Sequence, residues 1–152
     1  MAVIPPNSAA IYSALFALAA GAKINGVAAF AFSKQRLIQP ESVDAAPALL
    51  MEQLPEDYEG GVGKHAKVIL RARLWIFAQT PLPSDDRVPS DVLNPLKDAV
   101  LAALAPPPAT YPNQTLGGLV THTWIDGKTW FAEGLADQWG IVALPVTMVA
   151  SF

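Results

Sequence analysis

The feature that most constrains the fold is a run of strict two-residue alternation between residues 66 and 79. Successive side chains of a β-strand point to opposite faces, whereas a helix repeats its apolar positions every three or four residues. The run therefore predicts one long strand over residues 66–79 with an apolar even face. That face holds Ala66, Val68, Leu70, Ala72, Leu74, Ile76 and Ala78.

The odd face of the same strand mixes basic and apolar side chains. It holds Lys67, Ile69, Arg71, Arg73, Trp75, Phe77 and Gln79. Trp75 and Phe77 make one end of this face too apolar to lie in plain solvent, so we expect protein to cover it. The candidate interface residues on this strand are Arg71, Arg73, Trp75 and Phe77.

Two helices are expected, one on each side of the long strand in the sequence. Asn7 or Ser8 can cap a first helix of about three turns, which ends near Gly21. A second helix is expected to begin near residues 90–95, with Asn94 as its cap and Pro95 as its first residue. Its buried stripe is Leu93, Leu96, Val100 and Leu104, and it ends at Pro106, Pro107 and Pro108.

Further strands are expected on both sides of the second helix. Residues 27–32 and 48–53 form short apolar runs, and Pro55 limits the second of them. In the last third, Asp126-Gly127 predicts a hairpin between residues 119–125 and 128–133. Residues 139–150 alternate again, and Pro145 marks an edge or a bulge. This order predicts an α+β fold, a mainly antiparallel β-sheet with two helices packed on one face and a C-terminal β-meander.

The composition favours one domain over residues 1–152 that associates with other protein. The chain is 52% hydrophobic and 15% charged, against about 25% charged for an average domain. A net charge of −3 argues against a general nucleic-acid-binding surface. The apolar run at residues 9–22 is shorter than the roughly 20 residues that span a bilayer. We therefore expect neighbouring subunits, and not a membrane, to cover part of the surface.

No motif predicts catalysis, a cofactor or a metal site. The glycine-rich segment 59–65 lacks the pattern of a phosphate-binding loop, because His65 follows the lysine and a strand comes next. The absence of cysteine removes thiol chemistry and thiolate zinc sites. His65 and His122 could bind zinc only with carboxylates such as Asp126 or Glu133, and their spacing does not favour it. We therefore expect a protein without enzymatic activity.

Two runs of opposite charge follow each other in the chain. The acidic run holds Glu52, Glu56, Asp57 and Glu59, and the basic run holds Lys64, Lys67, Arg71 and Arg73. One interpretation is two separate solvated patches, which contribute little to stability. The other is a head-to-tail ring in which the acidic loop of one subunit meets the basic strand of the next. On the second interpretation Glu56, Asp57 and Glu59 are also interface candidates.

The order of these elements and several short segments carry a family resemblance. The segments are Pro47-Ala48-Leu49-Leu50, Gln114-Thr115-Leu116-Gly117-Gly118-Leu119-Val120 and Ala143-Leu144-Pro145-Val146-Thr147. They lie, respectively, after the first helix, before the expected hairpin and in the closing strand. Over nearly its whole length the chain resembles the tail terminator (tail completion) proteins of long-tailed bacteriophages.

The resemblance implies a structural virion protein that is assembled in the cytoplasm of a bacterial host. Such a subunit would form a homohexameric ring at the head-proximal end of the tail tube, stop tube polymerisation and offer a surface to the head-completion proteins. DNA would at most pass through the lumen. Two alternatives stay open: another neck component, such as a connector or tail tube protein, and a small cytosolic ligand-binding domain.

Overall fold

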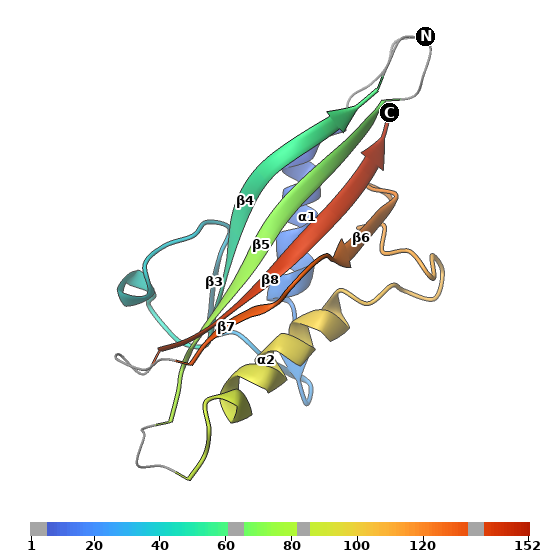
Figure 1. The fold of residues 1–152 in the computed structure, drawn as a ribbon. Helices are drawn as coiled ribbons and strands as arrows, with labels where there is room; N and C mark the ends of the chain where they lie inside the picture. Colours follow the sequence, from blue (N-terminus) through green and yellow to red (C-terminus); the bar gives the residue numbers. More distant parts are fainter. Residues whose placement is uncertain (1–5, 61–65, 82–85, 134–138) are drawn as a thin grey trace.

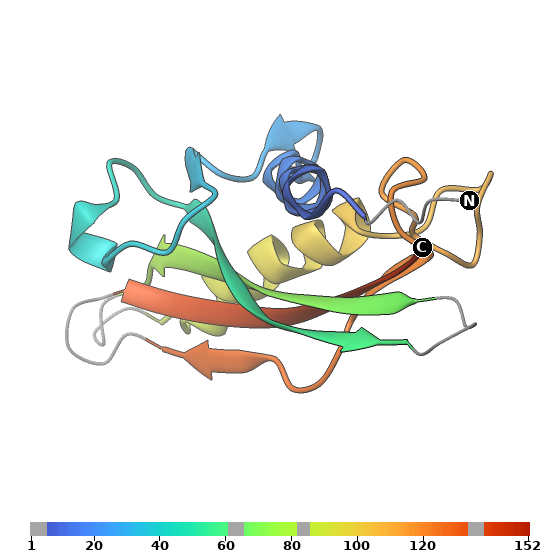
Figure 2. The same cartoon turned by 90° about the horizontal axis from the view of Figure 1, so that it is seen from above.

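The chain folds into two layers, a twisted β-sheet and a pair of helices that lie over one of its faces (Figures 1 and 2). The computed structural model describes residues 6–60, 66–81, 86–133 and 139–152. The elements in chain order are α1 (Ser8–Ala20), β1 (Lys23–Ile24), β2 (Val27–Ala28), β3 (Phe32–Lys34), η1 (Pro40–Ser42), β4 (Ala48–Glu59), β5 (Lys67–Gln79), α2 (Ser90–Ala103), β6 (His122–Ile125), β7 (Trp130–Ala132) and β8 (Trp139–Ser151).

The main sheet has the strand order β3-β4-β5-β8-β6, and β7 pairs with β8 further along the edge that β6 occupies. Every pairing is antiparallel except β3 with β4. The α+β fold with a mainly antiparallel sheet and a C-terminal meander is therefore confirmed. Neither helix in the described ranges is long and apolar enough to cross a membrane.

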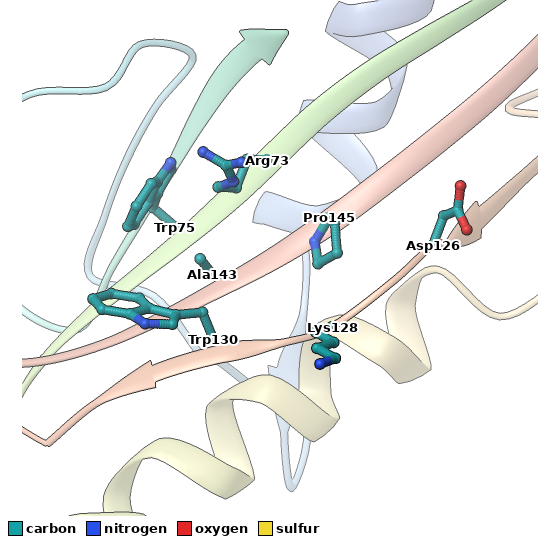
Figure 3. Close-up of a pocket in the computed structure, with 7 residues that line it drawn as sticks. All are labelled: Arg73, Trp75, Asp126, Lys128, Trp130, Ala143 and Pro145. Carbon is teal, nitrogen blue, oxygen red and sulfur yellow. The ribbon is translucent and has the colours of Figure 1, made fainter.

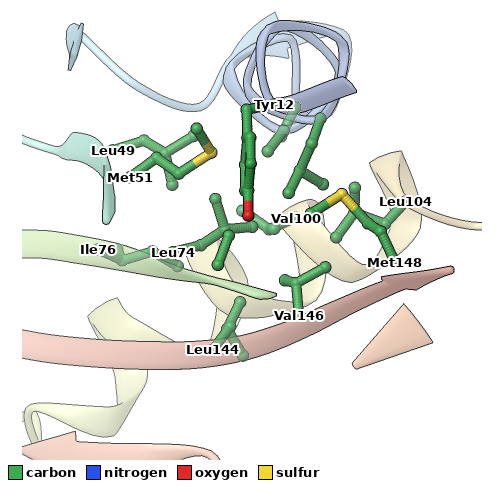
Figure 4. Close-up of a cluster of buried hydrophobic side chains, with 14 of the residues drawn as sticks. Tyr12, Leu49, Met51, Leu74, Ile76, Val100, Leu104, Leu144, Val146 and Met148 are labelled. Atoms are coloured by element: carbon green, nitrogen blue, oxygen red, sulfur yellow. The ribbon is translucent and has the colours of Figure 1, made fainter. Parts of the chain in front are cut away.

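The hydrophobic core lies between the helices and the even face of β5 (Figure 4). Val68, Leu70, Leu74 and Ile76 are fully buried there, as the alternation predicted. Burial of a large aliphatic side chain contributes about 1.5–3 kcal/mol, so these positions set which face the helices cover. The helices and the neighbouring strands β4 and β8 add Ile11, Tyr12, Leu15, Leu49, Met51, Leu93, Val100, Leu144 and Met148 to the same core.

Helix α1 begins where the sequence predicts. The side-chain oxygen of Asn7 accepts a hydrogen bond from the Ala10 amide at 3.1 Å, which satisfies one of the free donors of the first turn. The helix ends at Gly21. The buried side chains of α1 are Ile11, Tyr12, Leu15 and Ala19. Tyr12 reaches polar partners across the sheet, which a hydrophobic stripe does not indicate.

Helix α2 begins at Ser90, at the early end of the expected range, but the expected cap at Asn94 is wrong, because Pro95 lies in the interior of the helix. The Asp91 carboxylate accepts a hydrogen bond from the Val88 amide at 3.1 Å and so stabilises the earlier start. Leu93, in this first part of the helix, is fully buried. Tertiary packing of Leu93 offsets the backbone hydrogen bond that Pro95 removes.

The predictions of strands at residues 27–32 and 48–53 are only partly correct. Residues 27–32 divide into β2, which pairs with β1, and β3, which joins the main sheet. The second strand, β4, runs past Pro55 to Glu59. Its register with β5 shifts between Leu54 and Asp57. This bulge accommodates Pro55, which we expected to limit the length of the strand.

The predicted hairpin at Asp126-Gly127 is wrong. Strand β6 pairs with residues 146–149 of β8, and β7 pairs with residues 141–143, so the two lie end to end along one edge. The Asp126 amide donates to the Pro145 carbonyl at 2.9 Å, and Gly127 has a φ of +107°, which favours glycine. Pro145 lies in the central strand β8. Its backbone nitrogen, which has no hydrogen to donate, faces the gap between β6 and β7.

Candidate functional site

The face of the sheet away from the helices carries the odd positions of β5, and we call it the open face. Across it, the register places side chains in rows that run from β4 to β6 or β7. One row is Glu52, Arg73 and Pro145, and the next is Leu50, Trp75, Ala143 and Trp130. The rows nearer the end of β4 contain Leu54, Asp57, Ile69, Arg71, His122, Trp124, Thr147 and Val149.

The charged end of the open face is a ladder of ion pairs within one chain. Lys67 Nζ lies 3.1 Å from Glu59 Oε2, and the Arg71 guanidinium binds the Asp57 carboxylate. Antiparallel pairing of β4 with β5 brings the acidic and basic runs together. Exposed pairs of this kind contribute about 0–1 kcal/mol each. Contacts of these charges between subunits stay a prediction.

Glu56 lies apart from this ladder, on the side of β4 toward helix α1. Its carboxylate accepts hydrogen bonds from the hydroxyls of Tyr12, at 3.0 Å, and Tyr58, at 2.9 Å, and from the Gln53 amide at 3.3 Å. Burial and the bond to Glu56 raise the pKa of Tyr12 well above its usual value. The bond to Glu56 also raises the pKa of Tyr58. Glu56 therefore joins a helix to the outer part of β4.

The apolar end of the open face is covered by the chain itself. Phe77 is 3% exposed and forms a buried cluster with Ala48 and Leu50. Ile38 and Val43, from the segment between β3 and β4, pack against this cluster. The expected cover is thus present, but it is intramolecular. Phe77 is thus buried within its own chain, and a role for it in a subunit interface stays a prediction.

A cavity of about 420 Å³ opens beside Trp75 (Figure 3). We call it the aromatic cavity; it is lined by Arg73, Trp75, Asp126, Lys128, Trp130, Ala143 and Pro145. The Trp75 and Trp130 rings meet edge to face, with centroids 6.2 Å apart, a favourable aromatic geometry. Both residues pair with Ala143 of β8 from opposite sides. The small side chain of Ala143 leaves room between the two indoles.

Polar groups surround the aromatic cavity. The Trp75 indole N–H donates to Glu52 Oε2 at 2.9 Å, and Arg73 lies over the Trp75 ring and 3.4 Å from the same oxygen. The Thr147 hydroxyl donates to Asp126 at 3.0 Å. Within the described part of the chain, Lys128 makes no ion pair. The cavity therefore combines apolar walls with the charges of Arg73, Lys128 and Asp126, and among the described residues Lys128 forms no ion pair.

Sequence reasoning identified Arg73 and Trp75 but missed Lys128 and Trp130. The hairpin that it expected would have placed the return strand against residues 119–125. In the structure Trp130 pairs instead with Ala143, and this register brings the two indoles together. In the sequence, only Gly127 and Pro145 indicate that the edge strand is interrupted. They do not indicate that the interrupted strand pairs with β8.

His122 is held by protein contacts. Its Nδ1 accepts a hydrogen bond from the Gln114 amide at 3.1 Å, and its ring stacks on Trp124 at 5.2 Å. Over the described ranges, no group of three or more potential ligands lies together to hold a metal ion. The glycine-rich segment 61–65, with Lys64 and His65, lies outside the described residues.

A second exposed surface is the uncharged connection between α2 and β6. No Asp, Glu, Lys or Arg occurs from residue 99 to residue 125. Tyr111 in this segment is 75% exposed. Gln114 holds the start of the connection against the helix, because its side-chain amide donates to the carbonyls of Leu104 and Ala105.

Comparison with known proteins does not identify a family: no family model matches this sequence, and no curated protein is significantly similar to it.

Proposed function

We propose that this chain is a tail terminator subunit of a long-tailed bacteriophage. In this proposal it forms a ring at the head-proximal end of the tail tube, ends tube polymerisation and offers a surface for head-tail joining. It acts by binding and catalyses no reaction. It works in the virion, after assembly in the host cytoplasm.

The observation that carries the proposal is the open face of the sheet. The helices cover only the other face (Figure 2), and the open face presents half-buried apolar side chains such as Ile69, Trp124 and Val149. A partly apolar face of this kind is typical of a surface that contacts other protein. The low charge content of the chain, 15%, fits the same interpretation.

The edges of the sheet are irregular, which favours contacts between subunits through the faces of the sheet. The outer part of β4 carries the bulge at Pro55, and the opposite edge is interrupted at Gly127 into strands of four and three residues. Bulges, prolines and short edge strands discourage edge-to-edge pairing between chains. Subunits of a ring would therefore meet through side chains on faces and loops.

The first test is the mass of the full chain in solution, measured by light scattering over a wide range of concentrations and at two salt levels. A closed multimer of about six subunits supports the ring. A mass that grows without limit supports a tube component instead. The second test is the length of tail tubes assembled from tube subunits of the same phage, with and without this chain. A terminator shortens the tubes, and unchanged lengths contradict the proposal.

The aromatic cavity favours a second candidate, a small ligand-binding domain. Its volume of about 420 Å³ lies in the usual range for small-molecule sites. This candidate predicts a monomer at all concentrations and no effect on tube length.

A further inference from the structure

We propose that the aromatic cavity receives the outer end of β4 from a second copy of this chain. We call residues 55–59 the β4 tip; its inserted group is the ring of Tyr58 together with the carboxylate of Glu56. The inference rests on the proposed function, because it names one contact of the ring.

The β4 tip presents an aromatic ring and a carboxylate in a fixed arrangement. Tyr58 is 65% exposed, and its hydroxyl donates to Glu56 Oε2 at 2.9 Å. The other oxygen of Glu56 is held by Tyr12 at 3.0 Å. Because both side chains are already ordered, docking them costs less conformational entropy than docking free side chains.

Among the described residues, the β4 tip also carries one negative charge without a basic partner, on Glu56. Asp57 and Glu59 form ion pairs with Arg71 and Lys67. In the described part of the chain, Glu56 has tyrosine and amide partners but no basic one. Once the ion pairs between the described residues are accounted for, the Tyr58 ring and the Glu56 carboxylate remain for a partner.

The aromatic cavity complements both groups. The indoles of Trp75 and Trp130 form an apolar wall at one end of the cavity, and Asp126 lies at the other end, with Lys128 between them (Figure 3). Arg73 is compensated by Glu52, so Lys128 supplies the available positive charge. A tyrosine ring against the indoles places its neighbouring carboxylate toward Lys128 and away from Asp126. Such complementarity sets the register of an interface.

The contact joins two different surfaces. Tyr58 pairs with Val68 near one end of β5, whereas the cavity lies beside Trp75 toward the other end. These ends are far apart along the strand (Figure 1), so a chain cannot fill its own cavity. A contact between different surfaces repeats head to tail, and it closes into a ring when the rotation between subunits permits.

The experiment uses the full chain and two single variants, Tyr58→Ser and Trp130→Ala. Both residues are more than half exposed, at 65% and 52%, and circular dichroism checks that each variant folds. We expect each variant to weaken self-association by about tenfold or more, the range of interface aromatic residues. Tyr111→Ser is the matched control, because it removes a more exposed tyrosine elsewhere and should change the association by less than about twofold.

Mixing the two variants tests the geometry directly. Each variant keeps one of the two surfaces, so at a concentration where each variant alone is monomeric, a mixture of Tyr58→Ser and Trp130→Ala should form a complex of two chains. Absence of a complex in the mixture, or wild-type masses for the single variants, overturns the inference.

The charge contact is tested with variants that remove one charge and keep a polar side chain. Lys128→Gln should weaken association by about threefold to tenfold in the wild-type chain, and by less than about twofold when Glu56→Gln is already present. Equal effects in both backgrounds contradict the pairing of Glu56 with Lys128. The measurement with Lys128→Gln and Glu56→Gln does not require Tyr58→Ser or Trp130→Ala to fold.

The outcomes separate this inference from the proposed function. Rings that persist in all variants overturn the docking and leave the terminator proposal intact. A wild-type chain that is monomeric at every concentration also overturns the docking, and the tube-length measurement then decides the proposed function.

Discussion

The hydroxyl of Tyr12 donates a hydrogen bond to Glu56 Oε1 at 3.0 Å, and it lies 3.3 Å from the carbonyl oxygen of Arg71. One buried side chain of α1 thus contacts both β4 and β5. The bulge between Leu54 and Asp57 places Glu56 where it can accept this bond. The contact ties the helix to the outer half of the sheet, where the β4 tip begins.

Replacing Tyr12 with phenylalanine should lower the free energy of unfolding by about 1–2 kcal/mol. The ring would still fill the core, but a carboxylate would lose one donor. Urea unfolding at neutral pH measures the change. Tyr111→Phe is the control, because the exposed Tyr111 side chain should tolerate the change within about 0.5 kcal/mol. Equal stability of Tyr12→Phe and wild type would show that the bond contributes nothing.

The stability of the protein should fall at high pH partly through Tyr12. Burial and the Glu56 bond raise its pKa above the ordinary value of 10.0, so the folded state holds the phenol proton more tightly than the unfolded state. This contribution is complete below about pH 10 and is lost as the pH rises further. Urea unfolding at pH 9, 10 and 11 should show a smaller loss for Tyr12→Phe than for wild type. Parallel losses would contradict the assignment.

Gly140→Ala should destabilise the protein by about 1–3 kcal/mol, the usual cost of overpacking. An added Cβ would lie 2.5 Å from Thr80 Cγ2 and 2.9 Å from both terminal methyl groups of Leu93. Thermal or urea unfolding measures the effect. Adding Thr80→Ser removes the closest methyl group and should restore part of the stability. If the double variant is no more stable than Gly140→Ala, the clash with Thr80 is not the cause.

Two acidic residues of β4 should differ in their importance for stability. Glu52 accepts the indole N–H of Trp75 in a partly buried site, so Glu52→Ala should cost about 1–2 kcal/mol. Glu59 pairs with Lys67 in a more exposed site, so Glu59→Ala should cost less than about 0.5 kcal/mol. Urea unfolding of both variants side by side measures the difference. The reverse order would contradict this account of the open face.

Local patterns predicted the elements whose environment is decided within a few residues. The alternation of residues 66–79 predicted both faces of β5, and Asn7 predicted the start of α1. In both cases the signal lies within a few neighbouring residues. Pro95 shows the limit, because a proline that favours a helix start lies inside α2 once Leu93 packs on the sheet.

The candidate site was only partly predictable, because it depends on register. Arg73 and Trp75 were identified from their shared strand face, and the structure places both at the aromatic cavity. Trp130 reaches the cavity only because β7 pairs with β8 and not with β6. Phe77 was expected to need cover from another subunit, but residues 35–47 return over it and supply Ile38 and Val43.

By itself the sequence determined the class of fold, the long two-faced strand and the face that the helices cover, because alternation and capping act between neighbouring residues. The tertiary structure alone decided the end-to-end placement of β6 and β7, the pairing of the acidic run with the basic run, and the meeting of Trp75 with Trp130. These features depend on which distant strands become neighbours and in which register. That choice follows from packing the whole sheet against α1 and α2, which no local pattern encodes.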